Sequence, residues 1–177
     1  MQNYHPNNYS VRYKISPFIY RIIIVTIFFG YLKLIHFESL PILVILLILS
    51  DPLDCRITLR SVDCKSLYYQ KHDKMTDLIC YIIFLTLFHN LFDCFTLQLL
   101  IGFTLYRAIG VYLFVKTSNC KYIQYFPDFI NSTMVAYTLY RMFYLKRYTY
   151  YILIILGMVG KILFEIYHHS HKYNNHI

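Results

Sequence analysis

The sequence predicts an all-α membrane protein, a polytopic bundle of about six transmembrane helices. Of its 177 residues, 58% are hydrophobic and 15% are charged. The apolar residues gather in runs that are too long for an ordinary soluble core. The formal net charge of +8 is explained by Lys and Arg in loops on one side of a membrane. No basic patch with a recognisable nucleic-acid fold accompanies that charge, so nucleic acid is not an expected partner.

The first helix is expected after a short cytoplasmic arm, residues 1–16. That arm is polar and lacks the apolar segment and cleavage site of a signal peptide. The first span is expected over about 17–37. Arg21 and Lys33 lie near its ends, where long side chains can reach the membrane interface.

The second span is predicted to continue beyond its apolar run. Residues 40–50 are only eleven residues long, and a crossing helix needs about 20. The helix therefore continues to about Arg60, or a new helix begins with Asp51 as its cap and Pro52 at its first position. The two alternatives place the Asp51 carboxylate differently.

Four more spans complete a transmembrane domain over 17–167, and a polar, His-rich tail follows at 168–177. The third and fourth spans are joined by a short turn and should be antiparallel, and a polar loop at 116–128 precedes the last two. These spans are predicted over 73–92, 94–115, 129–144 and 148–167.

Six spans put both termini on one side of the membrane, and the distribution of Lys and Arg makes that side the cytoplasmic one. Three charged residues fall inside the fourth and sixth spans. Lys161 and Glu165 are four residues apart and can pair on one helix face, whereas Arg107 has no partner nearby in the sequence.

The stretch 51–77 concentrates acidic residues between two apolar runs. It holds five of the nine acidic residues of the chain. Asp51 and Asp54 are three apart, and Asp73 and Asp77 are four apart, so each pair shares one face of a helix. Two such helices side by side would bring four carboxylates together.

Four unpaired carboxylates at the edge of a bilayer would lose hydration at a cost of several kcal/mol per ion. Two divalent cations would offset that charge, and oxygen ligands suit Mg²⁺, Mn²⁺ or Ca²⁺. The alternative is a solvated loop in which nearby basic residues neutralise the carboxylates. Those basic residues are Arg56, Arg60, Lys65, Lys71 and Lys74.

The spacing of these residues resembles the signature of the CDP-alcohol phosphotransferases (CDP-alcohol phosphatidyltransferases), a six-helix membrane family. That signature reads D-x2-D-G-x2-A-R-x8-G-x3-D-x3-D. Asp51 and Asp54 match its first acidic pair, Asp73 and Asp77 match its last, and Arg60 matches its Arg with one inserted residue. The chain is thus similar to a divergent member of that family.

The resemblance implies transfer of a substituted phosphate from a CDP-linked lipid to an alcohol acceptor, with release of CMP. It implies two Mg²⁺ or Mn²⁺ ions held by the four aspartates, with Asp77 as the general base. Arg60 would contact the donor's phosphates or nucleotide, and Arg56 would do so if the helix runs straight past the insertion. Membrane lipids and a second copy of the chain are further candidate partners.

The chain departs from the signature at three positions that the family fills with small residues. These positions hold Cys55, Leu59 and Tyr69. Small residues there let a nucleotide approach the helix backbone. The alternative function is therefore a non-catalytic multi-pass membrane protein, either a degenerate relative or a structural or partner-binding component.

Overall fold

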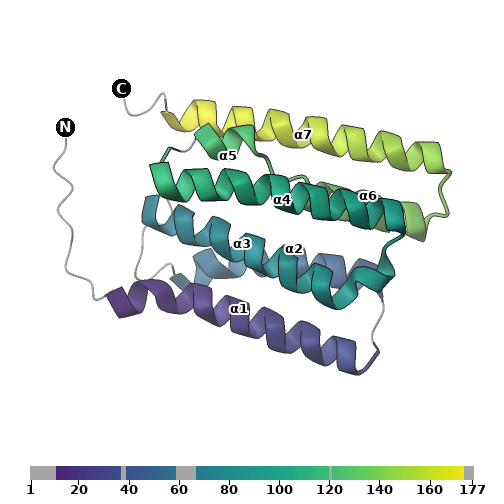
Figure 1. Cartoon of the computed structure of the whole chain (residues 1–177), viewed down its shortest axis with the longest axis horizontal. Coiled ribbons are helices and arrows are strands. Elements are labelled where there is room, and N and C mark those ends of the chain that lie inside the picture. Colours follow the sequence, from purple (N-terminus) through teal and green to yellow (C-terminus); the bar gives the residue numbers. More distant parts are fainter. Residues whose placement is uncertain (1–10, 37–38, 59–66, 120, 174–177) are drawn as a thin grey trace.

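The computed structural model describes the backbone of residues 11–36, 39–58, 67–119 and 121–173 (Figure 1). Side chains are described within 19–167, apart from 50–58, 68 and the gaps between those ranges. Every regular element in this part of the chain is helical. The helices are α1 (Val11–Leu34), α2 (Leu40–Thr58), α3 (Leu67–Phe88), η1 (His89–Leu91), α4 (Cys94–Thr117), α5 (Lys121–Tyr125), α6 (Ile130–Met142) and α7 (Arg147–Tyr173).

The all-α prediction is confirmed for the described residues, and three of their helical segments are long and apolar enough to cross a membrane. These are Tyr69–Leu91, Cys94–Thr117 and Arg147–Tyr167. A shorter apolar stretch, Leu40–Leu49, lies in α2. Six spans stay a prediction.

The second helix continues through Pro52, which agrees with the first alternative, a single helix that runs on past Asp51. α2 is one helix from Leu40 to Thr58, so Asp51 and Asp54 lie in its last two turns. α1 and α3 each begin six residues earlier than predicted, because the polar residues before the apolar runs are also helical. α7 likewise extends past the predicted end of the sixth span, to Tyr173.

The long helices lie side by side, with α1 at one edge of the bundle and α7 at the other (Figure 1). α1 contacts α2 and α3, α3 contacts α4, and α6 contacts α2, α4 and α7. Aromatic rings fill the space between α1 and α3. Phe29 meets Phe84 and Phe88 edge to face, with ring centroids 5.4 and 5.8 Å apart, an arrangement that aromatic pairs favour.

Large apolar side chains also cover the outer surfaces of several helices. Ile27 on α1, Leu105 on α4 and Leu163 on α7 are each more than 60% exposed. They belong to a larger set of exposed Ile, Leu, Phe and Tyr residues on the same helices. Extensive apolar surface of this kind is typical of a protein that contacts lipid.

The short helix α5 is held against α4 by Arg107, which is 5% exposed. Its guanidinium donates hydrogen bonds to the carbonyl oxygens of Phe126 and Ile123, just where α5 ends. The Tyr106 hydroxyl donates to the carbonyl oxygen of Tyr125. Carbonyls at a helix end lack partners within the helix. Arg107, which has no partner nearby in the sequence, therefore caps a helix that the sequence did not predict.

Gly110 allows the segment after α5 to approach α4. A Cβ atom at Gly110 would overlap the Phe126 side chain, with Cγ 2.7 Å away, whereas one at Gly102 on the same helix would meet nothing within 4 Å. We therefore expect Gly110→Ala to lower the melting temperature, because overpacking costs about 1–3 kcal/mol.

Gly102→Ala is the matched control, because the same change eight residues earlier meets open space. It should leave the melting temperature unchanged or raise it, since alanine favours a helix by up to about 1 kcal/mol. Thermal unfolding of both variants in detergent is the measurement. Equal effects of the two substitutions would show that α5 is not packed on α4 in this way.

Candidate functional site

The second acidic pair lies on one face of α3, as its spacing predicts. Asp73 is 9% exposed, and each of the Asp73 and Asp77 side chains is 12% exposed. Because α3 begins at Leu67, both residues lie past the first turn, and the helix amides there bond to helix carbonyls. The carboxylates therefore need partners from side chains.

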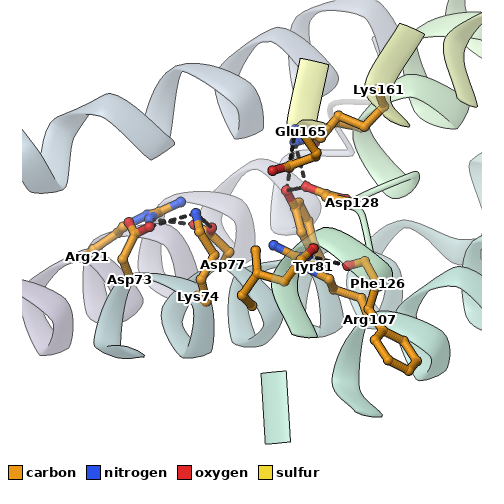
Figure 2. A network of polar contacts seen from close by, with 12 residues as sticks. Arg21, Asp73, Lys74, Asp77, Tyr81, Arg107, Phe126, Asp128, Lys161 and Glu165 are labelled. Carbon is orange, nitrogen blue, oxygen red and sulfur yellow. Dashed lines mark hydrogen bonds and ion pairs between the residues drawn. The ribbon is translucent and has the colours of Figure 1, made fainter. Parts of the chain in front are cut away.

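Two basic side chains supply those partners (Figure 2). Lys74 Nζ lies 2.7 Å from Asp73 Oδ2 and 3.1 Å from Asp77 Oδ2. Arg21 Nη1 on α1 donates to Asp77 Oδ1 at 2.9 Å. Among the described side chains, two negative and two positive groups thus form one cluster between α1 and α3, the acid–base cluster.

The position of Arg21 corrects the prediction that its side chain reaches the membrane interface. It is 5% exposed and bonds Asp77. α1 begins at Val11, so Arg21 lies well inside the helix and not at its end. A guanidinium this buried needs a carboxylate, since an unpaired buried charge is strongly destabilising.

A second polar group continues along the same face of α3, one turn beyond Asp77. The Tyr81 hydroxyl donates to Asp128 Oδ2 at 2.6 Å, and Asn131 Nδ2 donates to the Tyr81 hydroxyl at 2.6 Å and to Asp128 at 3.2 Å (Figure 2). Asp128 is 8% exposed and also accepts from the backbone N–H of Ile130 at 3.0 Å. The sequence analysis missed this group, although Tyr81 follows Asp77 by the same four residues that relate Asp73 to Asp77.

The other predicted site residues fall where side chains are not described. Asp51, Asp54 and Arg56 are in α2 by their backbone, and Arg60 lies outside the described residues. α2 contacts α3, as a shared site requires. The meeting of the two acidic pairs stays a prediction.

Asp73 and Asp77 are chemically suited to a hard divalent cation. They offer carboxylate oxygens, and the Lys74 ammonium already lies within 3.1 Å of both, so the pair does attract positive charge. Within the described ranges, no group of three or more His, Cys, Asp or Glu side chains is placed to hold a metal ion. A two-ion site therefore requires Asp51 and Asp54 as well.

The predicted pairing of Lys161 with Glu165 is confirmed, with Nζ 3.2 Å from Oε1 on α7. Glu165 is 8% exposed. This pair is a useful comparison for the acid–base cluster, because here a lysine meets a buried carboxylate one turn away on the same helix.

Fold and site define a class of protein: an all-α chain with helices able to cross a membrane, and with carboxylates and basic groups buried together between two of them. No protein-family model, curated protein or solved structure matches the chain.

Replacement of Lys74 tests whether the carboxylate pair takes up a metal. Lys74→Met removes the ammonium next to Asp73 and Asp77, so it should lower the free energy of unfolding by at least about 1 kcal/mol. Added Mn²⁺ should then raise the melting temperature of this variant more than that of the unaltered protein, because a ligand of the folded state stabilises it.

Lys161→Met is the control, since it removes a lysine ammonium from one buried carboxylate on the same helix, that of Glu165. Thermal unfolding with and without Mn²⁺ gives the comparison. If Mn²⁺ protects both variants equally, or neither, the pair on α3 is not a specific cation site.

Proposed function

We propose that this protein is a membrane phosphotransferase similar to the CDP-alcohol phosphatidyltransferases. It would move a substituted phosphate from a CDP-linked lipid to an alcohol and release CMP. The observation that supports this most is the buried pair Asp73 and Asp77 on one face of an apolar helix. Their two carboxylates already share one positive group, the Lys74 ammonium.

Asp77 is the proposed general base. It takes the proton of the acceptor hydroxyl as that oxygen bonds to the β-phosphorus of the donor. The bond from this phosphorus to the oxygen that bridges it to CMP breaks, and CMP leaves with that oxygen and its electron pair. The Asp77 oxygens bond to Arg21 and Lys74, so an acceptor hydroxyl must displace or share one of these bonds.

Asp51, Asp54, Asp73 and Asp77 together would hold two Mg²⁺ or Mn²⁺ ions. The chemistry that bound ions supply is neutralisation of the pyrophosphate, which phosphoryl-type transfer chiefly needs. Arg60 or Arg56 would contact the phosphates or the nucleotide of the donor. The contact between α2 and α3 would position these side chains relative to one another.

We propose a topology of six spans with both termini in the cytoplasm. Figure 1 draws the start of α1, the start of α3 and the end of α7 at the same end of the bundle. Asp73 and Asp77 lie in the part of α3 nearer to that end. The site would then face the cytoplasm, where a CDP-linked donor meets the membrane.

A non-catalytic multi-pass membrane protein is the second candidate. The observation in its favour is that Arg21 and Lys74 already compensate Asp73 and Asp77. Ion pairs of this kind can serve the packing of α1 on α3 alone. An activity assay separates the two candidates.

The proposed base gives a direct test. Asp77→Asn keeps the size of the side chain and removes its basicity, so we expect CMP release to fall by about 100-fold or more. The assay uses membranes that contain the protein, a CDP-linked lipid, a panel of alcohols, and Mg²⁺ or Mn²⁺.

Glu165→Gln is the matched control, because it makes the same carboxylate-to-amide change at another buried lysine pair. It should retain most of the activity. If Asp77→Asn releases CMP at the rate of the unaltered protein, the assignment of Asp77 as the general base is wrong. Absence of CMP release from the unaltered protein with every acceptor favours the non-catalytic candidate.

A further inference from the structure

A polar pocket of about 430 Å³ lies far along the bundle from the acid–base cluster, where α6 ends and α4 begins. It is lined by Asp93, Tyr137, Tyr140, Arg141, Tyr144 and Leu145. The connections from α3 to α4 and from α6 to α7 are both drawn at this end in Figure 1. The pocket therefore opens at an end of the bundle where helices that can cross a membrane would reach the membrane surface.

Arg141 supplies the positive charge of this pocket. It lies at the end of α6, and within the described residues it forms no ion pair. Its Nη1 is 3.4 Å from the Tyr137 hydroxyl, and its guanidinium carbon is 6.0 Å from the centre of that ring. The ring supports the side chain, and the planar donor fork suits a phosphate group.

Asp93 supplies the opposite charge. Its Oδ1 accepts the backbone N–H of Thr96 at 2.7 Å and so caps α4. Its Oδ2 has no hydrogen-bond partner in the described part of the chain. Although both line the pocket, Asp93 and Arg141 are not within the 4.0 Å of an ion pair. Opposite charges held apart in one pocket match a ligand that itself carries both.

Tyrosine rings form the walls between these charges. Tyr137 is fully buried, and its hydroxyl accepts the backbone N–H of Asp93 at 3.1 Å. The Tyr140 ring stacks on Tyr150 with centroids 5.0 Å apart. Tyr144 is 93% exposed. Aromatic faces beside a carboxylate are the usual surroundings of a bound quaternary ammonium.

Tyr144 holds its place at a conformational cost. Its φ is 49°, and the N–H of Leu145 bonds the carbonyl oxygen of Tyr140 at 3.1 Å, which makes Tyr144 the left-handed residue that ends α6. Glycine is the favoured residue there, and a side chain in this conformation costs roughly 1–2 kcal/mol. Replacement by glycine thus removes the ring without weakening the helix end.

We propose that this pocket binds the headgroup of a zwitterionic phospholipid. The phosphodiester contacts Arg141, and the ammonium lies between Asp93 and the rings of Tyr140 and Tyr144. Exposed Lys146, Arg147 and Tyr148 follow directly in the chain, and such residues are common at the membrane interface. This site is independent of the proposed phosphotransferase activity.

Binding of a short-chain lipid to the purified protein in a choline-free detergent tests the proposal. The probe is dihexanoyl phosphatidylcholine below its critical micelle concentration, with dihexanoyl phosphatidylglycerol and inorganic phosphate as comparisons. We expect the choline lipid to bind at least about tenfold more tightly than either, the equivalent of one favourable contact. Arg141→Gln and Asp93→Asn, which keeps a cap on α4, should each weaken it to a similar degree.

Tyr144→Gly separates binding from folding. It should weaken binding of the choline lipid several-fold while the melting temperature stays equal or rises. Lys146→Gln, an exposed charge that does not line the pocket, should bind as the unaltered protein does. Equal binding of the glycerol lipid or of phosphate, or unchanged binding by Arg141→Gln and Asp93→Asn, would overturn the proposal.

Discussion

The burial of opposite charges between α1 and α3 is the constraint on which the rest of the structure depends. Asp77 bonds Arg21 across the two helices, and Lys74 joins Asp73 to Asp77 along α3. Removing either sign of charge leaves the other buried without compensation, which is far more costly than never burying the pair. The cluster therefore fixes how α1 packs on α3, and the rings of Phe29 and Phe84 complete that contact.

The same physics explains why this cluster is a candidate for chemistry. An apolar packing of similar volume would be as stable as a buried ion pair, or more so, so stability alone gives no reason to keep charged residues there. Carboxylates that attract a lysine ammonium can also attract a metal ion or a reacting hydroxyl. Burial of these charges is explained if they serve binding or catalysis, and this argument supports a functional role for the cluster, such as the proposed activity, beside its role in packing.

The long helices could be predicted from apolar runs, and the shared face of Asp73 and Asp77 from their spacing. The contacts of Arg21 and Arg107 could not, because they join segments far apart in the sequence. The helix α5 was missed because its residues read as a polar loop, and it is held by Arg107 from outside the segment. Long-range contacts of this kind leave no local pattern. The junction of the two acidic pairs, at which Asp51 and Asp54 would meet Asp73 and Asp77, is by contrast predicted from the motif alone and stays a prediction.

Electron paramagnetic resonance of Mn²⁺ bound to the purified protein tests that junction most directly. If Asp51 and Asp54 meet Asp73 and Asp77, the protein takes up two ions about 3.5–4 Å apart. Their spectrum is then exchange-coupled, and it is lost in Asp54→Asn as well as in Asp73→Asn. A spectrum of isolated Mn²⁺, or a coupled spectrum that survives Asp54→Asn, would contradict a site shared by α2 and α3.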